Sequence, residues 1–96
     1  MHAVINHLRL KEPISDDVWD LTERELAARC REIEGFDSAK VVRIADDHIV
    51  LVIVADTAAT LDRIATEAGN DFMVEHVIPH LAEPPQRAIG EVVASF

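Results

Sequence analysis

The chain has 96 residues, 18 of them acidic and 9 basic, which gives a formal net charge of −9 with histidine neutral, and 49% of the residues are hydrophobic. This length fits one domain, residues 1–96, and a domain so small buries a limited share of its surface. The acid excess argues against a nucleic-acid surface, three scattered glycines exclude a glycine-rich phosphate loop, and a single cysteine excludes a disulfide or a thiolate metal site.

The first predicted element is a strand from His2 to Leu10, because polar and apolar residues alternate along it with a period of two. This segment lacks the basic start and long apolar core of a signal peptide. The longest apolar run of the chain, Ile49 to Ala55, is far shorter than a membrane span. We therefore expect a soluble, cytoplasmic domain with no membrane partner.

A helix is predicted next, from Asp16 to about Glu34. Ser15 is placed to cap its first turn, and Gly35 to end it. At helical spacing one arc gathers the inward-facing side chains, namely Val18, Trp19, Thr22, Leu26, Cys30 and Ile33. Cys30 lies in the middle of this arc, where we expect it to act as a small hydrophobic residue.

Two strands follow, over residues 39–45 and 48–55, joined by a tight turn at Asp46-Asp47. The second of them has no polar alternation between Ile49 and Val54. A strand of this kind is covered on both faces.

The second helix is predicted to begin at Asp56 or Thr57. The sequence Gly69-Asn70-Asp71 interrupts it, and the apolar residues that follow lie nearly opposite the earlier apolar stripe. We therefore expect a break or kink there, with Asp71 capping a second short helix that ends before Pro84-Pro85. A last strand is predicted from Arg87 to Phe96.

The order strand, helix, strand, strand, helix, strand predicts an α+β, ferredoxin-like βαββαβ domain with an antiparallel sheet. Two helices cover one face of such a sheet and leave the other open. Because the strand Ile49–Val54 is apolar on both faces, we expect the open face to meet a second copy of the chain in a homodimer.

The whole chain resembles the dimeric α/β barrel superfamily, and within it the antibiotic-biosynthesis-monooxygenase-like domains. The resemblance depends on size, on element order, on the phrase REIEGFDSAKVVR after the first helix, and on HVIPHL at the end of the second. It implies that two subunits form one barrel and that each keeps a cavity between sheet and helices. It also implies a monooxygenase that needs no bound cofactor and acts on a flat aromatic or quinol-type substrate.

Asn6 and His76 are the predicted catalytic residues. Asn6 stands mid-strand among apolar neighbours, where an amide needs a partner or a ligand, although a backbone group or water would also satisfy it. Histidine suits a general base because its pKa lies near neutrality. The family that the chain resembles also includes haem-degrading enzymes. These carry an asparagine on the first strand and an axial histidine on the second helix, and the resemblance matches these positions to Asn6 and His76. The tryptophan that those relatives carry nine or ten residues before the histidine is absent, since Ala65-Thr66-Glu67 stands there.

Trp19, Phe72 and His80 are the predicted substrate-binding residues, with Trp19 offering a flat surface to a planar ring. His76 and His80 are four residues apart, but no third ligand accompanies them, so we predict no metal site. Two alternatives stay open beside the monooxygenase. One is a haem- or tetrapyrrole-binding protein with His76 as the iron ligand, and the other is a non-catalytic dimeric ligand-binding or interaction domain.

Overall fold

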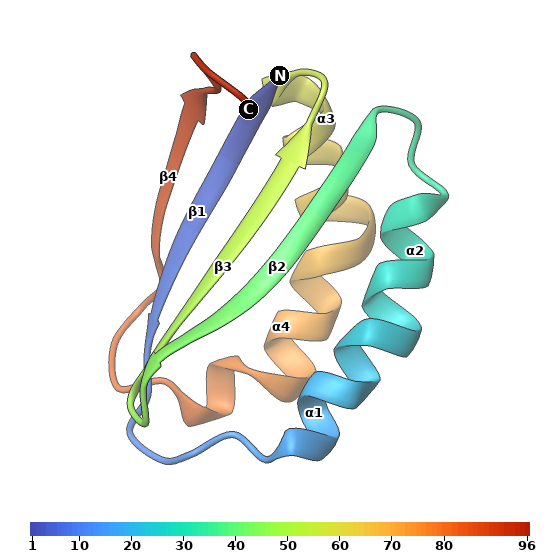
Figure 1. Cartoon of the computed structure of the whole chain (residues 1–96). Helices are drawn as coiled ribbons and strands as arrows, with labels where there is room; N and C mark the ends of the chain where they lie inside the picture. Colours follow the sequence, from blue (N-terminus) through green and yellow to red (C-terminus); the bar gives the residue numbers. More distant parts are fainter.

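The computed structural model describes the whole chain, residues 1–96. Figure 1 shows a layer of strands with the helices packed against one side of it. The elements in chain order are β1 (His2–Arg9), α1 (Asp16–Leu21), η1 (Thr22–Leu26), α2 (Ala27–Arg31), β2 (Phe36–Ala45), β3 (His48–Ala55), α3 (Ala58–Ile64), η2 (Ala65–Gly69), α4 (Asn70–His76), η3 (Ile78–His80) and β4 (Gln86–Glu91).

The four strands form one antiparallel sheet in the order β2-β3-β1-β4. This arrangement confirms the predicted α+β, ferredoxin-like fold. The last strand ends at Glu91, so the expected strand from Arg87 to Phe96 is too long at its C-terminal end. None of the helices combines the length and the apolar character needed to cross a membrane.

The first helix runs without interruption from Asp16 to Arg31 through α1, the π-helical segment η1 and α2. It ends about a turn before Gly35, where the backbone takes a left-handed φ of 98°. The predicted inward arc is confirmed, since Leu26, Cys30 and Ile33 are buried. Ser15 occupies the predicted N-cap position, but its side chain makes no capping hydrogen bond.

The second helix also runs continuously, through α3, η2 and α4, so no break occurs at residues 69–71, and the irregularity is a π-helical segment just before Asn70. Gly69 and Asn70 keep helical backbone angles, and Asp71 lies inside α4 instead of capping it. The π-helical segment Ala65–Gly69 fits an extra residue into the turn. That extra residue rotates the later side chains relative to the earlier ones, and Leu61 before it and Val77 after it are both buried in the core.

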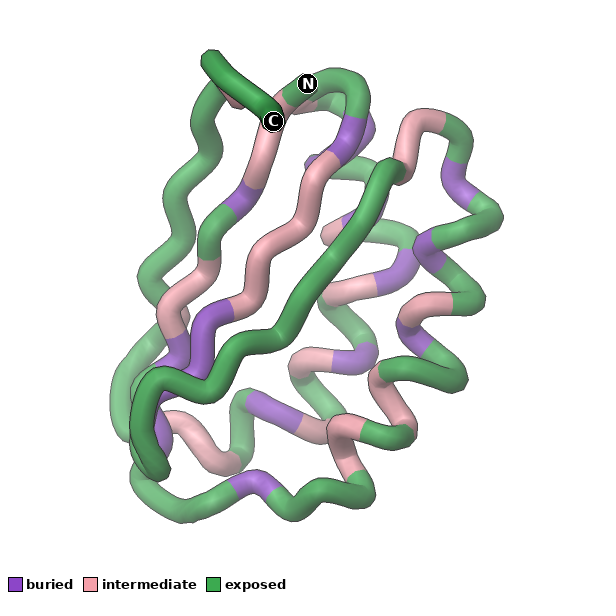
Figure 2. The backbone as a smooth tube through the Cα atoms, in the orientation of Figure 1, coloured by how far each residue is buried: buried purple, intermediate pink, exposed green.

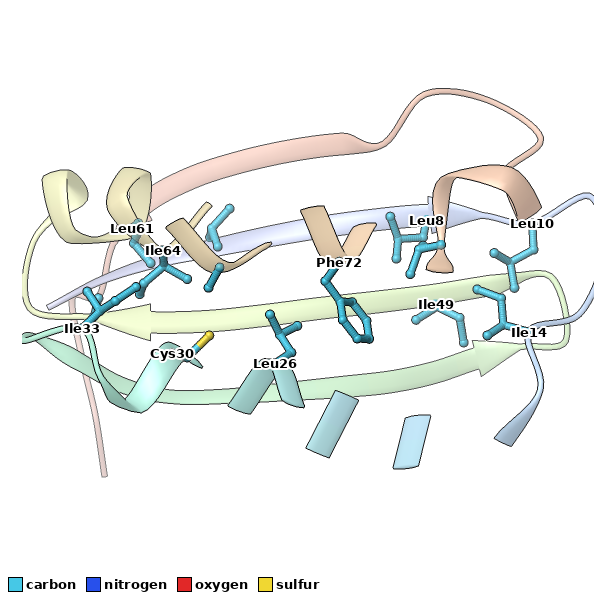
Figure 3. Close-up of a cluster of buried hydrophobic side chains, with 14 residues drawn as sticks. Leu8, Leu10, Ile14, Leu26, Cys30, Ile33, Ile49, Leu61, Ile64 and Phe72 are labelled. Carbon is cyan, nitrogen blue, oxygen red and sulfur yellow. The ribbon is translucent and has the colours of Figure 1, made fainter. Parts of the chain in front are cut away.

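The hydrophobic core fills the space between the sheet and the helices (Figure 3). Its largest fully buried side chains are Leu8, Leu61, Ile64 and Val77. In Figure 2 the buried segments lie on β1, β3 and the inner sides of the helices, whereas β2 and β4 are exposed along most of their length.

The opposite face of the sheet carries no helix, and we call it the open face. The register places the following residues on it: Ala3, Ile5, His7, Arg9, Ser38, Lys40, Val42, His48, Val50, Val52, Val54, Gln86, Ala88 and Gly90. No carboxylate is among them, although the chain as a whole is acidic. The sequence predicts that this face is covered, but the chain itself does not cover it. Ile5 is 43% exposed and Val42 is 41% exposed.

Candidate functional site

A groove of about 800 Å³ lies between the first helix and strands β2 and β3. Its helical wall includes Trp19 and Leu26, and its floor is the helix-facing side of the sheet, including Val41, Leu51 and Ile53. The volume falls within the range of about 300–1,000 Å³ that small-molecule sites occupy. Eleven of its 19 lining residues are hydrophobic, so the groove suits a ligand that is largely apolar.

Charged side chains at the groove form one ion pair across it. Arg43 of β2 reaches Asp16, in the first turn of α1, at 3.3 Å between Nη2 and Oδ1. Both side chains are well exposed, and a surface pair of this kind contributes about 0–1 kcal/mol. Because the pair is weak, an anionic ligand can replace Asp16 as the partner of Arg43.

Trp19 is half-buried and lines the groove with one side while it packs against the core with the other. It lies on the inward arc of the first helix, as the sequence predicts. Phe36, at the start of β2, lines the same groove, and the periodicity of the sequence does not single it out. Two aromatic side chains therefore border the space available to a ligand.

Cys30 also lines the groove, and its thiol is buried. Burial raises the pKa of this thiol, and the nearby Arg31 offsets only part of that effect. The side chain therefore contributes an apolar, protonated thiol and no nucleophile.

Asn6 lies on the helix-facing side of β1, in register with Leu51 of β3 and Arg87 of β4. Its Oδ1 atom is buried and has no hydrogen-bond partner. The sequence predicts such an amide without an obvious partner among apolar neighbours. Asn6 does not, however, line the groove. Its catalytic role stays a prediction.

His76 closes α4 and also lies outside the groove. Its ring centroid is 4.8 Å from that of Phe72, and its Nε2 atom is 3.7 Å from a carboxylate oxygen of Glu75. His80 also lies outside the groove, and its Nδ1 atom is 3.1 Å from a carboxylate oxygen of Glu12. The structure therefore does not bring the two predicted catalytic residues to the groove that Trp19 lines.

Haem does not fit the arrangement that the sequence suggests for it. No histidine lines the groove beside the first helix. His76 packs on Phe72 outside that space. No group of three or more His, Cys, Asp or Glu side chains is placed to hold a metal ion.

A histidine pair that the sequence does not reveal lies on the open face. Nδ1 of His7 and Nε2 of His48 are 2.9 Å apart, and the two rings are stacked at 5.2 Å between centroids. Burial lowers the pKa of His48, and the charges of Arg9 and His7 lower it further, against the opposing effect of Asp47. His48 is therefore held as a neutral imidazole near neutral pH.

No protein-family model matches the chain, and no curated protein matches it in sequence. Several solved structures match its backbone over nearly the whole length. A protein of unknown function from Nitrosomonas europaea superposes with a TM-score of 0.80 at 12% identity, covering 99% of this chain and 91% of the other. A structure described as an antibiotic biosynthesis monooxygenase has a TM-score of 0.74 at 23% identity, covering 98% and 100% of the two chains.

A mutant form of SnoaB, a cofactor-independent oxygenase from Streptomyces nogalater, has a TM-score of 0.75 at 12% identity and covers 98% of this chain and 94% of its own. The TM-scores of these superpositions demonstrate a shared fold. The sequence identities are too low to transfer an activity, which must be argued from the site itself. The chain therefore has the ferredoxin-like fold of the antibiotic biosynthesis monooxygenase-like proteins.

Proposed function

We propose that the chain is a monooxygenase that needs no bound cofactor and oxidises a flat hydroxyarene in the groove beside Trp19. The observation that carries this proposal is the groove itself, about 800 Å³, lined by eleven hydrophobic residues among nineteen and bordered by the aromatic rings of Trp19 and Phe36. The likeness in fold to SnoaB, a cofactor-independent oxygenase, supports the type of reaction.

In this reaction the substrate itself supplies the electrons. A hydroxyarene that loses its phenolic proton to water donates electrons to dioxygen, a carbon–oxygen bond forms at a ring carbon, and the peroxide takes up a proton from water. The resulting hydroperoxide loses water and leaves a quinone carbonyl. One oxygen atom of dioxygen stays in the product and the other leaves as water.

The role we assign to Arg43 is to stabilise the phenolate. A nearby cation favours the ionised form of a phenol and lowers its pKa. Arg43 is available because its present partner, Asp16, is exposed and weakly held. Trp19 would stack on the ring system of the substrate.

Asn6 and His76 are a second candidate pair, as the resemblance of the sequence implies. The unpartnered, buried Oδ1 of Asn6 is the observation in their favour. Since neither residue lines the groove, their participation requires a ligand bound between β1 and the second helix. Asn6→Ala and His76→Ala then reduce turnover, whereas a ligand confined to the groove leaves both variants active.

We further propose that a second copy of the chain covers the open face. The centre of this face is apolar, with Ile5 of β1 opposite Val52 of β3 in register. It bears no carboxylate, so two such faces meet without acid–acid repulsion in a chain whose net charge is −9. The groove lies on the other side of the sheet, so dimerisation leaves it accessible.

Trp19 is the only tryptophan, so intrinsic fluorescence reports directly on the groove. Purified protein is titrated with naphthols and anthrols, and the quenching of Trp19 measures binding. Dioxygen uptake and the transfer of one labelled oxygen atom from isotopically labelled dioxygen measure turnover. Arg43→Gln is expected to reduce turnover about tenfold or more, because it removes a charge-assisted contact worth about 1.5–3 kcal/mol.

Two neighbouring alanines provide a matched control. Ala27→Phe places a ring in the groove and should abolish quenching, whereas Ala28→Phe adds the same ring at an exposed position outside it. Quenching without dioxygen uptake identifies a non-catalytic ligand-binding domain and refutes the proposed activity. Equal binding by the two phenylalanine variants refutes the groove as the site.

A further inference from the structure

A second, much smaller hollow of about 20 Å³ lies behind the groove, where both helices meet the sheet. Five residues line both spaces, namely Trp19, Thr22, Leu26, Val41 and Leu51. Deeper in the molecule the hollow is bounded by Leu8 of β1, Phe72 and Met73 of α4, and Val77. Figure 3 shows Leu26 and Phe72 entering this part of the core from opposite helices.

The surface of the hollow is entirely apolar. Its one hydroxyl-bearing residue is Thr22, whose Oγ1 donates to the carbonyl oxygen of Val18 at 2.8 Å. A water molecule needs two to four polar partners, and this hollow offers none. Its volume nevertheless exceeds the roughly 10–15 Å³ that one water-sized molecule requires. A small apolar molecule fits the hollow better than water does.

We propose that this hollow is a binding site for dioxygen, an inference that rests on the proposed oxygenase function. Dioxygen is small and apolar, and apolar cavities in proteins take up molecules of that kind while they exclude water. The shared wall of Trp19, Leu26 and Leu51 places the hollow directly beside the ring system of a substrate in the groove. The site holds dioxygen next to the carbon that it attacks.

Xenon is the probe for this site, because its binding does not depend on catalysis. Xenon added to the protein should shift the NMR signals of the methyl groups of Leu8, Met73 and Val77, which line the hollow and not the groove. Val77→Ile fills the hollow and should weaken xenon binding severalfold, whereas Val77→Ala enlarges it and should strengthen binding. Val74 is 62% exposed on α4, three residues before Val77. Val74→Ile and Val74→Ala are therefore matched controls that should leave xenon binding unchanged.

Kinetics provide the second measurement. Val77→Ile should raise the KM for dioxygen severalfold and leave the quenching of Trp19 by the aromatic substrate unchanged. A xenon response that is absent, or that is the same in both Val77 variants, overturns the gas site even if the protein turns over naphthols. A xenon response that follows the Val77 series without any dioxygen uptake supports the gas site and refutes the proposed oxygenase function.

Discussion

Two residues of β1 that lie on opposite sides of the sheet allow a quantitative test of the homodimer. Leu8 faces the helices and is 2% exposed, whereas Ile5 faces away from them and is 43% exposed in a single chain. Truncation of a fully buried leucine or isoleucine to alanine costs about 2–5 kcal/mol, because it removes apolar contact and leaves a cavity. Leu8→Ala is therefore expected to cost about 3 kcal/mol.

The cost of Ile5→Ala depends on whether a second copy covers the open face. In a lone subunit a half-exposed isoleucine contributes about half the transfer free energy of a buried one, or about 1 kcal/mol. In a homodimer the same side chain is buried, and its truncation should cost about as much as that of Leu8. Since 1 kcal/mol corresponds to about 4–8 °C in Tm for a domain of this size, the two outcomes differ by roughly 10 °C.

The assay is thermal unfolding of the unaltered chain and both variants, followed by circular dichroism over roughly a hundredfold range of protein concentration. We expect the Tm of the unaltered chain to rise with concentration and that of Ile5→Ala to fall by nearly as much as that of Leu8→Ala. Sedimentation should show the unaltered chain as a dimer. A Tm that does not change with concentration, together with a loss of about 1 kcal/mol or less for Ile5→Ala, refutes the reasoning.

Three further predictions concern single residues. The pKa of His48 is lowered from 6.5 in the folded chain, so its neutral ring stabilises the fold above pH 6.5, and this stabilisation is lost as the pH falls through the folded pKa. Urea unfolding between pH 7 and 5 should show the free energy of unfolding falling with pH. His48→Gln should weaken that pH dependence. Gly35→Ala should cost about 1–3 kcal/mol, because φ is +98° and the added methyl group meets the Asp56 carboxylate; if Asp56→Ala restores none of this loss, the contact is not its cause. Thr57→Ala should cost about 1 kcal/mol, because the Thr57 hydroxyl accepts from the amide of Thr60, and Ser15→Ala should cost less, because Ser15 makes no such bond; equal losses in denaturant unfolding would contradict the assignment of the caps.

The element order and the buried faces could be predicted from the sequence, because both depend on local periodicity. The alternation in β1 and the arc from Trp19 to Ile33 predict which side chains enter the core, and the structure agrees. The course of the second helix could not be predicted in the same way. A straight α-helix would place Leu61 and Val77 on nearly opposite sides, yet both are buried, and the sequence does not show whether a break or a π-helical turn solves that problem.

The site was harder to predict because it depends on distances between elements. The periodicity of the first helix places Trp19 inward, but only the packing of that helix against β2 creates the groove that it lines. The sequence does not show which face of the sheet Arg43 takes, since its approach to Asp16 joins residues far apart in the chain. The pair His7 and His48 likewise depends on the register of β1 against β3.

Strand β2, which forms the outer wall of the groove, is also an edge of the sheet, with its outer backbone groups free to pair with another strand. Irregularities in its pairing occur at both ends, between Phe36 and Ser38 and between Arg43 and Ala45. Such bulges twist an edge strand, and Lys40 places a charge in the regular stretch between them. The β2 edge is therefore a poor template for edge-to-edge pairing with a strand of another molecule. At this edge a chain with this much valine and isoleucine in its strands is therefore protected from adding neighbours strand by strand, while the face of the sheet remains free to associate.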